Sequence, residues 1–263
     1  MIQRNMKSPK EDAKVFNEIV DNELSFVDTL KLMEITDKSY VDLKSVLNRL
    51  VRDEQLFSIQ KGLYVIRNFR NPYVIANAML PDGAIAYWSA LNLHGLTEQI
   101  PNVVYLQSGK RKSDKKVFNV RYRFIQVKKE KICGITQMGY SNERFRITDI
   151  EKTLLDCFDL PQYAGGYEEL IRAFYQAKIN SRKLLDYGKQ MGNLSVLKRL
   201  AFLSELFEMQ GFNHFQNEVF KMRDQRYTLF NPMGSNEGAF NAKWRIRLNI
   251  DKDKLLEIVN KMY

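Results

Sequence analysis

One amphipathic helix is encoded by SYVDLKSVLNRLVRD, residues 39–53. Ser39, with Asp42 three residues later, is typical of a helix N-cap, so Asp42 is expected to cap the helix rather than face a phosphate. At 100° per residue, apolar and polar side chains separate onto opposite sides. The inner set is Leu43, Val46, Leu47 and Leu50, and the outer set is Ser45, Asn48, Arg49 and Arg52. The pattern predicts a helix buried along its leucines.

Two further helices and a β-hairpin are predicted around this segment. The serine-then-acid spacing recurs in Ser8-Pro9-Lys10-Glu11 and in Ser25-x-x-Asp28, and each predicts the start of a helix. Two β-rich runs, residues 56–60 and 63–67, surround Lys61-Gly62, which predicts a hairpin. Three helices followed by a hairpin are typical of a winged helix-turn-helix, here residues 1–70.

The charge distribution favours nucleic acid as the partner of this domain. The chain has a formal net charge of +10. Residues 1–37 carry 5 basic and 8 acidic side chains, whereas residues 38–70 carry 7 and 3, so positive charge gathers on the third helix and the wing. Arginine can bind guanine, and asparagine adenine, through paired hydrogen bonds. The expected DNA-binding residues are Lys38, Lys44, Ser45, Asn48, Arg49, Arg52, Lys61 and Arg67. The alternative is that Arg49 and Arg52 are solvated helix charges.

Residues 71–263 are predicted to form a larger α+β domain. Helices are expected at 73–79, 84–93, 166–177, 181–190 and 194–210, with another that begins at the capping box Thr148-x-x-Glu151. Strands are expected at 103–106 and 121–127. The fold class is therefore α+β, with a winged helix-turn-helix followed by a mixed domain that contains a small antiparallel sheet.

A second basic surface is encoded by residues 110–131, with 10 basic and 2 acidic side chains. Residues 243–248 alternate cations with apolar side chains and widen this surface if their strand joins the same sheet. Two interpretations stay open: charged strand edges that oppose aggregation, or a contact for nucleic acid or an acidic protein. The residues concerned are Lys110, Arg111, Lys112, Lys115, Lys116, Arg121, Arg123, Lys243, Arg245 and Arg247.

The sequence contains few residues arranged for catalysis. Cys133 and Cys157 stand alone, and His94 and His214 have no partner at ligand spacing, so no metal, cofactor or disulfide is expected. Gly234-Ser235 and Asp251-x-Asp253 are faintly similar to a nucleotidyltransferase signature, although the aspartates also suit the cap of a final helix at 254–262. No leader or long apolar segment is found, so we expect a cytoplasmic protein that is not an enzyme.

Several strings resemble the AbiEi family, the antitoxin and transcriptional-regulator half of abortive-infection toxin–antitoxin systems. They are Ala86-Tyr87-Trp88-Ser89-Ala90-Leu91, His94-Gly95-Leu96-Thr97, residues 146–156 (RITDIEKTLLD), Pro161-x-Tyr163-x-Gly165-Gly166 and the wing segment Lys61-Gly62-Leu63-Tyr64-Val65. The resemblance covers about residues 10–210. It implies a winged-helix domain before an antitoxin domain, binding to inverted repeats in the protein's own promoter, and opposition to a nucleotidyltransferase-like toxin encoded beside it in an antiviral defence system.

The sequence thus leads to one hypothesis and two alternatives. The hypothesis is a DNA-binding transcriptional autorepressor and antitoxin, whose third helix and wing bind double-stranded promoter DNA. The first alternative is a toxin-neutralising interaction module without significant DNA binding. The second is a nucleic-acid-processing enzyme that uses Asp251 and Asp253.

Overall fold

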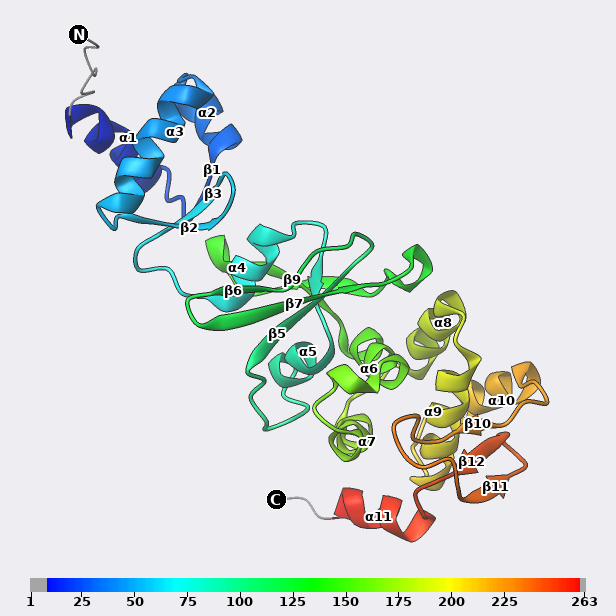
Figure 1. Ribbon diagram of the computed structural model, residues 1–263. Coiled ribbons are helices and arrows are strands. Elements are labelled where there is room, and N and C mark those ends of the chain that lie inside the picture. Colours follow the sequence, from blue (N-terminus) through cyan, green and yellow to red (C-terminus); the bar gives the residue numbers. More distant parts are fainter. Residues whose placement is uncertain (1–8, 261–263) are drawn as a thin grey trace. The chain divides into compact units, whose positions relative to one another are not determined.

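The computed structural model describes residues 9–260, which form two compact units (Figure 1). The N-terminal unit contains residues 9–81 and 140–143, and the C-terminal unit contains residues 82–139 and 144–260. Both combine helices with strands, so the chain is α+β. The division falls after Pro81 rather than near residue 70, because α4 (Pro72–Met79) belongs to the first unit.

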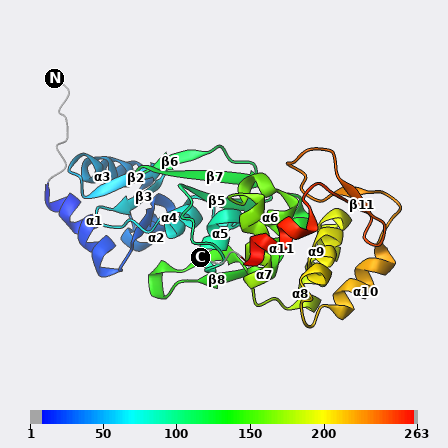
Figure 2. The ribbon, with the colours of Figure 1, turned by 90° about the horizontal axis from the view of Figure 1, so that it is seen from below.

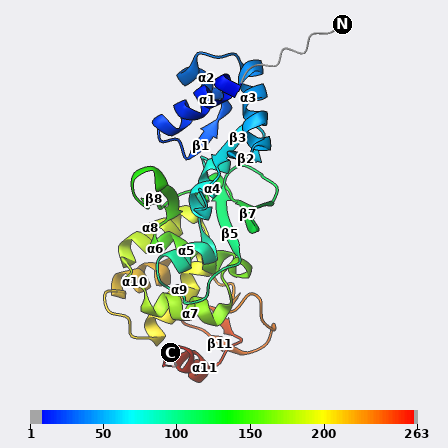
Figure 3. The same ribbon diagram turned by 90° about the vertical axis from the view of Figure 1, so that its left-hand side faces the viewer.

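Three helices and a three-stranded antiparallel sheet make up most of the N-terminal unit, with the helices grouped beside the strands in Figure 3. The sheet order is β1-β3-β2. The elements are α1 (Pro9–Asp21), β1 (Phe26–Asp28), α2 (Thr29–Thr36), α3 (Tyr40–Arg52), β2 (Leu56–Gln60) and β3 (Leu63–Ile66). Ser8, the expected cap of the first helix, lies outside the described residues.

The start of the second helix differs from the prediction. Phe26 and Val27 lie in β1, where they pair with Val65 and Tyr64 of β3. Helix α2 begins only at Thr29, and the Asp28 carboxylate caps it by accepting from the backbone N–H of Leu30 at 2.8 Å. Ser25-x-x-Asp28 resembles a helix start, but pairing with a distant strand determines the conformation instead.

Helix α3 and the hairpin follow the sequence pattern. The Ser39 hydroxyl accepts a hydrogen bond from the Asp42 backbone N–H, so the predicted cap is confirmed. The hairpin β2–β3 turns at Gly62, whose φ of +77° suits glycine. The unit's core includes the four predicted side chains Leu43, Val46, Leu47 and Leu50, each at most 1% exposed.

A six-stranded sheet organises the first half of the C-terminal unit, in the order β6-β7-β5-β4-β9-β8. Its strands are β4 (Ala84–Ile85), β5 (Val103–Ser108), β6 (Lys115–Val117), β7 (Val120–Gln126), β8 (Ile135–Met138) and β9 (Phe145–Thr148). The expected antiparallel sheet is in fact mixed, since β5 pairs with β7, and β4 with β9, in parallel. Long connections between these partners provide the parallel crossovers.

The C-terminal unit contains seven α-helices within the described residues, of which some pack on this sheet and others pack mainly on helices. Helix α5 packs against β5 and α6, while α8, α9 and α10 pack against one another (Figure 2). The expected helix at 84–93 begins later, because residues 84–85 form β4, and α6 is capped by Asp149 rather than Thr148. The helices are α5 (Tyr87–Leu93), α6 (Ile150–Asp159), α7 (Tyr167–Gln176), α8 (Ser181–Met191), α9 (Leu194–Leu206), α10 (Asn213–Met222) and α11 (Lys252–Asn260).

A separate small sheet follows α10, in the order β10-β12-β11. Its strands are β10 (Thr228–Leu229), β11 (Ala239–Asn241) and β12 (Ile246–Leu248). Residues 243–248 therefore do not join the larger sheet, and the condition under which they would widen the basic surface of residues 110–131 is not met. Trp244, Ile246 and Leu248 are buried as predicted, but the strand covers only residues 246–248, and residues 243–245 form a turn.

The final helix, α11, begins at Lys252 instead of 254, and residues 261–262 of the expected helix lie outside the described range. Among the described residues, no helix combines the length and apolar character that a membrane span requires.

Candidate nucleic-acid interface

A row of exposed and mainly polar side chains runs along one side of α3. Lys44, Ser45, Asn48 and Arg52 are all exposed, directly opposite the buried leucines. Their spacing of three or four residues places them on one face of the helix. The stripe begins with Val41, whose side chain is 71% exposed. We call these five residues the α3 stripe.

Most of the α3 stripe has its hydrogen-bonding capacity available. Within residues 9–260, neither Lys44 nor Asn48 makes a side-chain hydrogen bond or ion pair. The Ser45 hydroxyl donates to the Val41 carbonyl at 3.1 Å, so its lone pairs can still accept. Arg52 pairs with neighbouring Asp53 at 3.2 Å, but both side chains are more than half exposed and such a pair contributes little.

Arg49 does not belong to this free set. Its Nε and Nη2 atoms donate to the two carboxylate oxygens of Asp12 on α1, each at 2.6 Å. These hydrogen bonds raise the pKa of Arg49 above its ordinary value. The Arg49 side chain is only 23% exposed, so the pair joins α1 to α3 inside the unit. The expectation that Arg49 faces DNA is therefore corrected: its guanidinium already has a bidentate anionic partner.

Lys38 is neutralised in the same way. Its ammonium donates to Glu11 at 2.8 Å, and both side chains are about one-quarter exposed. Two adjacent carboxylates of α1 thus bind two of the cations that the sequence assigns to DNA. The sequence did not reveal this pairing, because Glu11 and Asp12 lie far from their partners along the chain.

The hairpin contributes two exposed cations. Lys61 lies at the β2–β3 turn. Arg67 follows β3 and lies 3.5 Å from Glu54, with both side chains more than 60% exposed, so this ion pair is weak and readily exchanged. Of the six cations predicted to bind DNA, four therefore remain accessible to phosphate: Lys44, Arg52, Lys61 and Arg67.

The basic segment at 110–131 is partly neutralised by local contacts. Lys110 pairs with Asp82, and Arg123 binds Asp114 at 3.0 Å, which raises the pKa of Arg123. Lys112 lies over the Phe124 ring, and burial lowers the pKa of Lys112. Besides Lys110, the exposed cations of this segment are Arg111, Lys116, Arg121, Lys128 and Lys129, whereas Lys115 is partly buried. Lys116 and Arg121 are directly opposed on β6 and β7, at the edge of the sheet.

Of the remaining predicted cations, Arg247 lies on β12 of the small sheet, and Lys243 and Arg245 lie in the turn before it. Lys243 pairs with Glu205, whereas Arg245 and Arg247 lie over aromatic rings. Of the ten residues of the expected second basic surface, Lys115, Lys116, Arg121 and Arg123 lie on the larger sheet, Arg247 lies on the small sheet, and the others lie in loops or turns, so they do not form one widened surface.

The strings on which the expected AbiEi resemblance depends lie mainly in the C-terminal unit, where several of their side chains are buried. Lys152 is fully buried and donates to Asp156 and, at 3.3 Å, to the Gln107 side-chain carbonyl. Burial raises the pKa of Asp156 to about 6. The His94 Nε2 atom lies 2.7 Å from the Thr148 carbonyl oxygen. These residues link α5, β9 and α6 within the unit.

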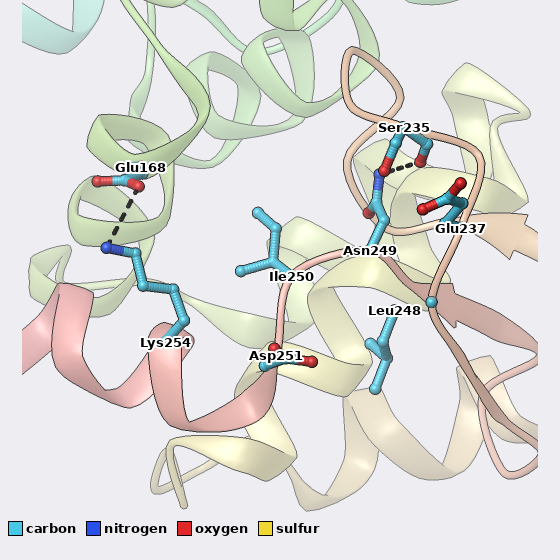
Figure 4. A pocket seen from close by; sticks show the side chains of 9 residues that line it. Glu168, Ser235, Glu237, Leu248, Asn249, Ile250, Asp251 and Lys254 are labelled. Atoms are coloured by element: carbon cyan, nitrogen blue, oxygen red, sulfur yellow. Dashed lines mark hydrogen bonds and ion pairs between the residues drawn. The ribbon is translucent and has the colours of Figure 1, made fainter.

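One groove brings together parts of the weak nucleotidyltransferase signature. It encloses about 440 Å³ and is lined by residues that include Ser235, Asp251 and Lys254 (Figure 4). Lys254 lies 3.9 Å from Glu168 across this groove. Asp253 does not line it. Within residues 9–260, no three His, Cys, Asp or Glu side chains form a group that could hold a metal ion.

The fold is shared with a solved protein. The crystal structure of the RV2827C protein from Mycobacterium tuberculosis matches this structure with a TM-score of 0.68, over 96% of each chain, at 14% sequence identity. No protein-family model matches the chain, and no curated protein does. At this level of identity the likeness concerns the fold alone.

Proposed function

We propose that this protein is a DNA-binding transcriptional autorepressor whose N-terminal unit acts as a winged helix-turn-helix. In this proposal α3 enters the major groove of promoter DNA, and the β2–β3 hairpin is the wing that contacts the backbone. The single observation that carries the proposal is the α3 stripe, since its polar side chains project from a helix whose opposite face is fixed in a core.

The chemistry of the stripe fits a base-pair edge. Asn48 can donate to and accept from adenine, and Lys44 and Arg52 can bind phosphate or guanine. Val41 adds an apolar side chain near the N-terminal end of the helix, the end that usually contacts bases. An exposed valine has a specific partner in the major groove, the thymine methyl group. The operator should therefore contain a thymine opposite Val41.

The number of accessible cations predicts how strongly DNA affinity should depend on salt concentration. If the four accessible cations each displace one counterion, the affinity of one protomer should fall about a hundredfold between about 50 and 200 mM salt. The dependence would be steeper if Lys38 and Arg49 also contacted phosphate.

A promoter-binding assay with matched variants tests the proposal. The triple variant Lys44→Ala/Asn48→Ala/Arg52→Ala should lose retention of DNA from upstream of the protein's own gene, because it removes the polar part of the stripe while leaving the core intact. Lys178→Ala/Arg182→Ala is the control, because it removes two exposed cations of the C-terminal unit that belong to neither candidate basic surface. Retention of DNA by the folded triple variant would contradict the assignment of α3.

The antitoxin role rests on the resemblance to AbiEi proteins, and we propose it for the C-terminal unit. Co-expression with the neighbouring gene tests this role, since the full chain should relieve any growth arrest that the neighbour causes. The α3 triple variant separates the two activities: it should lose promoter binding and still relieve the arrest. Failure of the wild-type chain to relieve arrest would remove the antitoxin proposal without affecting the DNA-binding one.

A further inference from the structure

The small sheet exposes aromatic rings on the side that faces away from the core. Ile246 and Leu248 of β12 are buried, so Arg247 between them lies at the opposite face of the sheet, and Arg245 lies in the turn that precedes β12. Phe240 is directly opposed to Arg247 in the β11–β12 pair. Phe240 is 61% exposed and Tyr227, immediately before β10, is 40% exposed.

Each ring lies beneath a guanidinium group. The Arg245 guanidinium carbon is 5.4 Å from the centre of the Tyr227 ring, and that of Arg247 is 5.2 Å from the Phe240 ring. The two rings meet edge to face, with their centres 4.8 Å apart. These four residues form one connected group, which we call the arginine–aromatic face.

Hydrogen bonds further fix the two arginines. Arg245 donates to the Tyr227 hydroxyl at 3.2 Å, and Arg247 donates to the Asn236 side chain at 3.2 Å. A guanidinium has five N–H donors, so donors remain on both groups. Because the side chains are already ordered, a partner that binds them loses little side-chain entropy.

The composition of this face is that of a protein-binding hot spot. Tyrosine and arginine are enriched at the centres of interfaces, where they combine apolar area with hydrogen-bond donors. The positive charge of the surrounding segment favours a partner with negative charge. Residues 221–247 contain 6 basic and 2 acidic side chains, which gives a net charge of +4.

We propose that the arginine–aromatic face binds an acidic segment of a partner protein, with carboxylates on Arg245 and Arg247 and apolar side chains against Tyr227 and Phe240. Single-stranded nucleic acid is less well suited, because bases need an open ring face for stacking and a guanidinium already covers one face of each ring. This proposal does not depend on DNA binding by α3.

Fluorescence anisotropy with the full chain tests the proposal. The probe is a labelled peptide in which Asp and Glu alternate with Leu and Phe, and the comparison probes are the same peptide with Lys in place of the acids and a labelled oligothymidine. The wild-type chain should bind the acidic peptide saturably. Arg245→Gln/Arg247→Gln and Phe240→Ser should each weaken this binding at least about tenfold, as expected for hot-spot residues.

The control variant is Lys178→Gln/Arg182→Gln, which removes the same charge from two exposed cations outside both candidate basic surfaces and should leave peptide binding unchanged. Circular dichroism should show that all variants remain folded. The proposal is overturned by an absence of saturable peptide binding, or by equal weakening in the control. It is also overturned if oligothymidine displaces the peptide and depends on the same residues, because the face would then be a single-strand binding site.

Discussion

The α3 stripe and the arginine–aromatic face both carry positive charge, but they differ in how far neighbouring side chains hold the cations in place. Lys44 is exposed without a partner among the described residues, and Arg52 has only an exposed ion pair. The Arg245 and Arg247 guanidinium carbons instead lie 5.4 and 5.2 Å from the centres of aromatic rings. Exposed cations without strong partners can adjust their side chains to the phosphates of a DNA backbone of any sequence. Arginines held by rings and hydrogen bonds present their N–H donors in a fixed geometry. The comparison teaches that the surroundings of a cation, rather than its number, indicate its partner.

The largest expected effect separates the two surfaces directly. Lys44→Ala/Arg52→Ala should weaken promoter binding by about a hundredfold, because two charge-assisted contacts are lost. Arg245→Gln/Arg247→Gln should leave it within about twofold, since ring-bound arginines outside the N-terminal unit do not contact the duplex in our proposal. Titration of labelled promoter DNA at one fixed salt concentration measures both values. Equal losses in the two variants would break the distinction.

A smaller effect concerns the apolar end of the α3 stripe. Replacing thymine by uracil throughout the promoter removes the methyl groups and should weaken wild-type binding about fivefold, the value of one buried methyl contact. Val41→Ala should bind both DNAs equally. If Val41→Ala still discriminates between the two, the methyl group is recognised by another residue.

The ion pair between α1 and α3 allows a third comparison, in which a fixed cation is released. Asp12→Asn removes the anionic partner of Arg49, and the freed guanidinium can then bind phosphate. Promoter affinity should rise about threefold and the salt dependence should steepen by about one phosphate. Binding measured across a salt series tests this. Weaker binding by Asp12→Asn would mean that the pair positions α3 for DNA.

The smallest effect is expected for the stability of the arginine–aromatic face. Phe240 is mostly exposed, so Phe240→Ala should change the free energy of unfolding by about 0.5 kcal/mol or less. Chemical denaturation provides the measurement. A loss of several kcal/mol would show that the ring serves the fold instead of a partner.

The sequence predicted the elements whose signals are local. The leucine spacing and Ser39 cap identified α3, and Lys61-Gly62 identified the hairpin. It missed β1 and β4, whose two or three residues take their conformation from strands far along the chain. Pairing between distant segments leaves no periodic signal in such short strands.

For the candidate site too, the sequence predicted the residues that depend on local periodicity and missed the contacts between distant segments. Lys44, Ser45, Asn48 and Arg52 followed from helical periodicity and are exposed as expected. Arg49 lies at the margin of the exposed face of α3, next to α1. Its partner Asp12 is on α1, so helical periodicity within α3 could not predict the pair. Val41 was missed because an exposed valine resembles an ordinary apolar position.

Methylation interference on promoter DNA tests the central claim most directly, because dimethyl sulfate modifies guanine N7 in the major groove and adenine N3 in the minor groove. With the wild-type protein, we expect guanine N7 methylation at specific positions to prevent binding. With Lys44→Ala or Arg52→Ala, the two variants that remove a candidate guanine contact, interference at one of these positions should disappear while the others persist. Interference confined to adenine N3, or a pattern unchanged by both variants, would contradict the placement of α3 in the major groove.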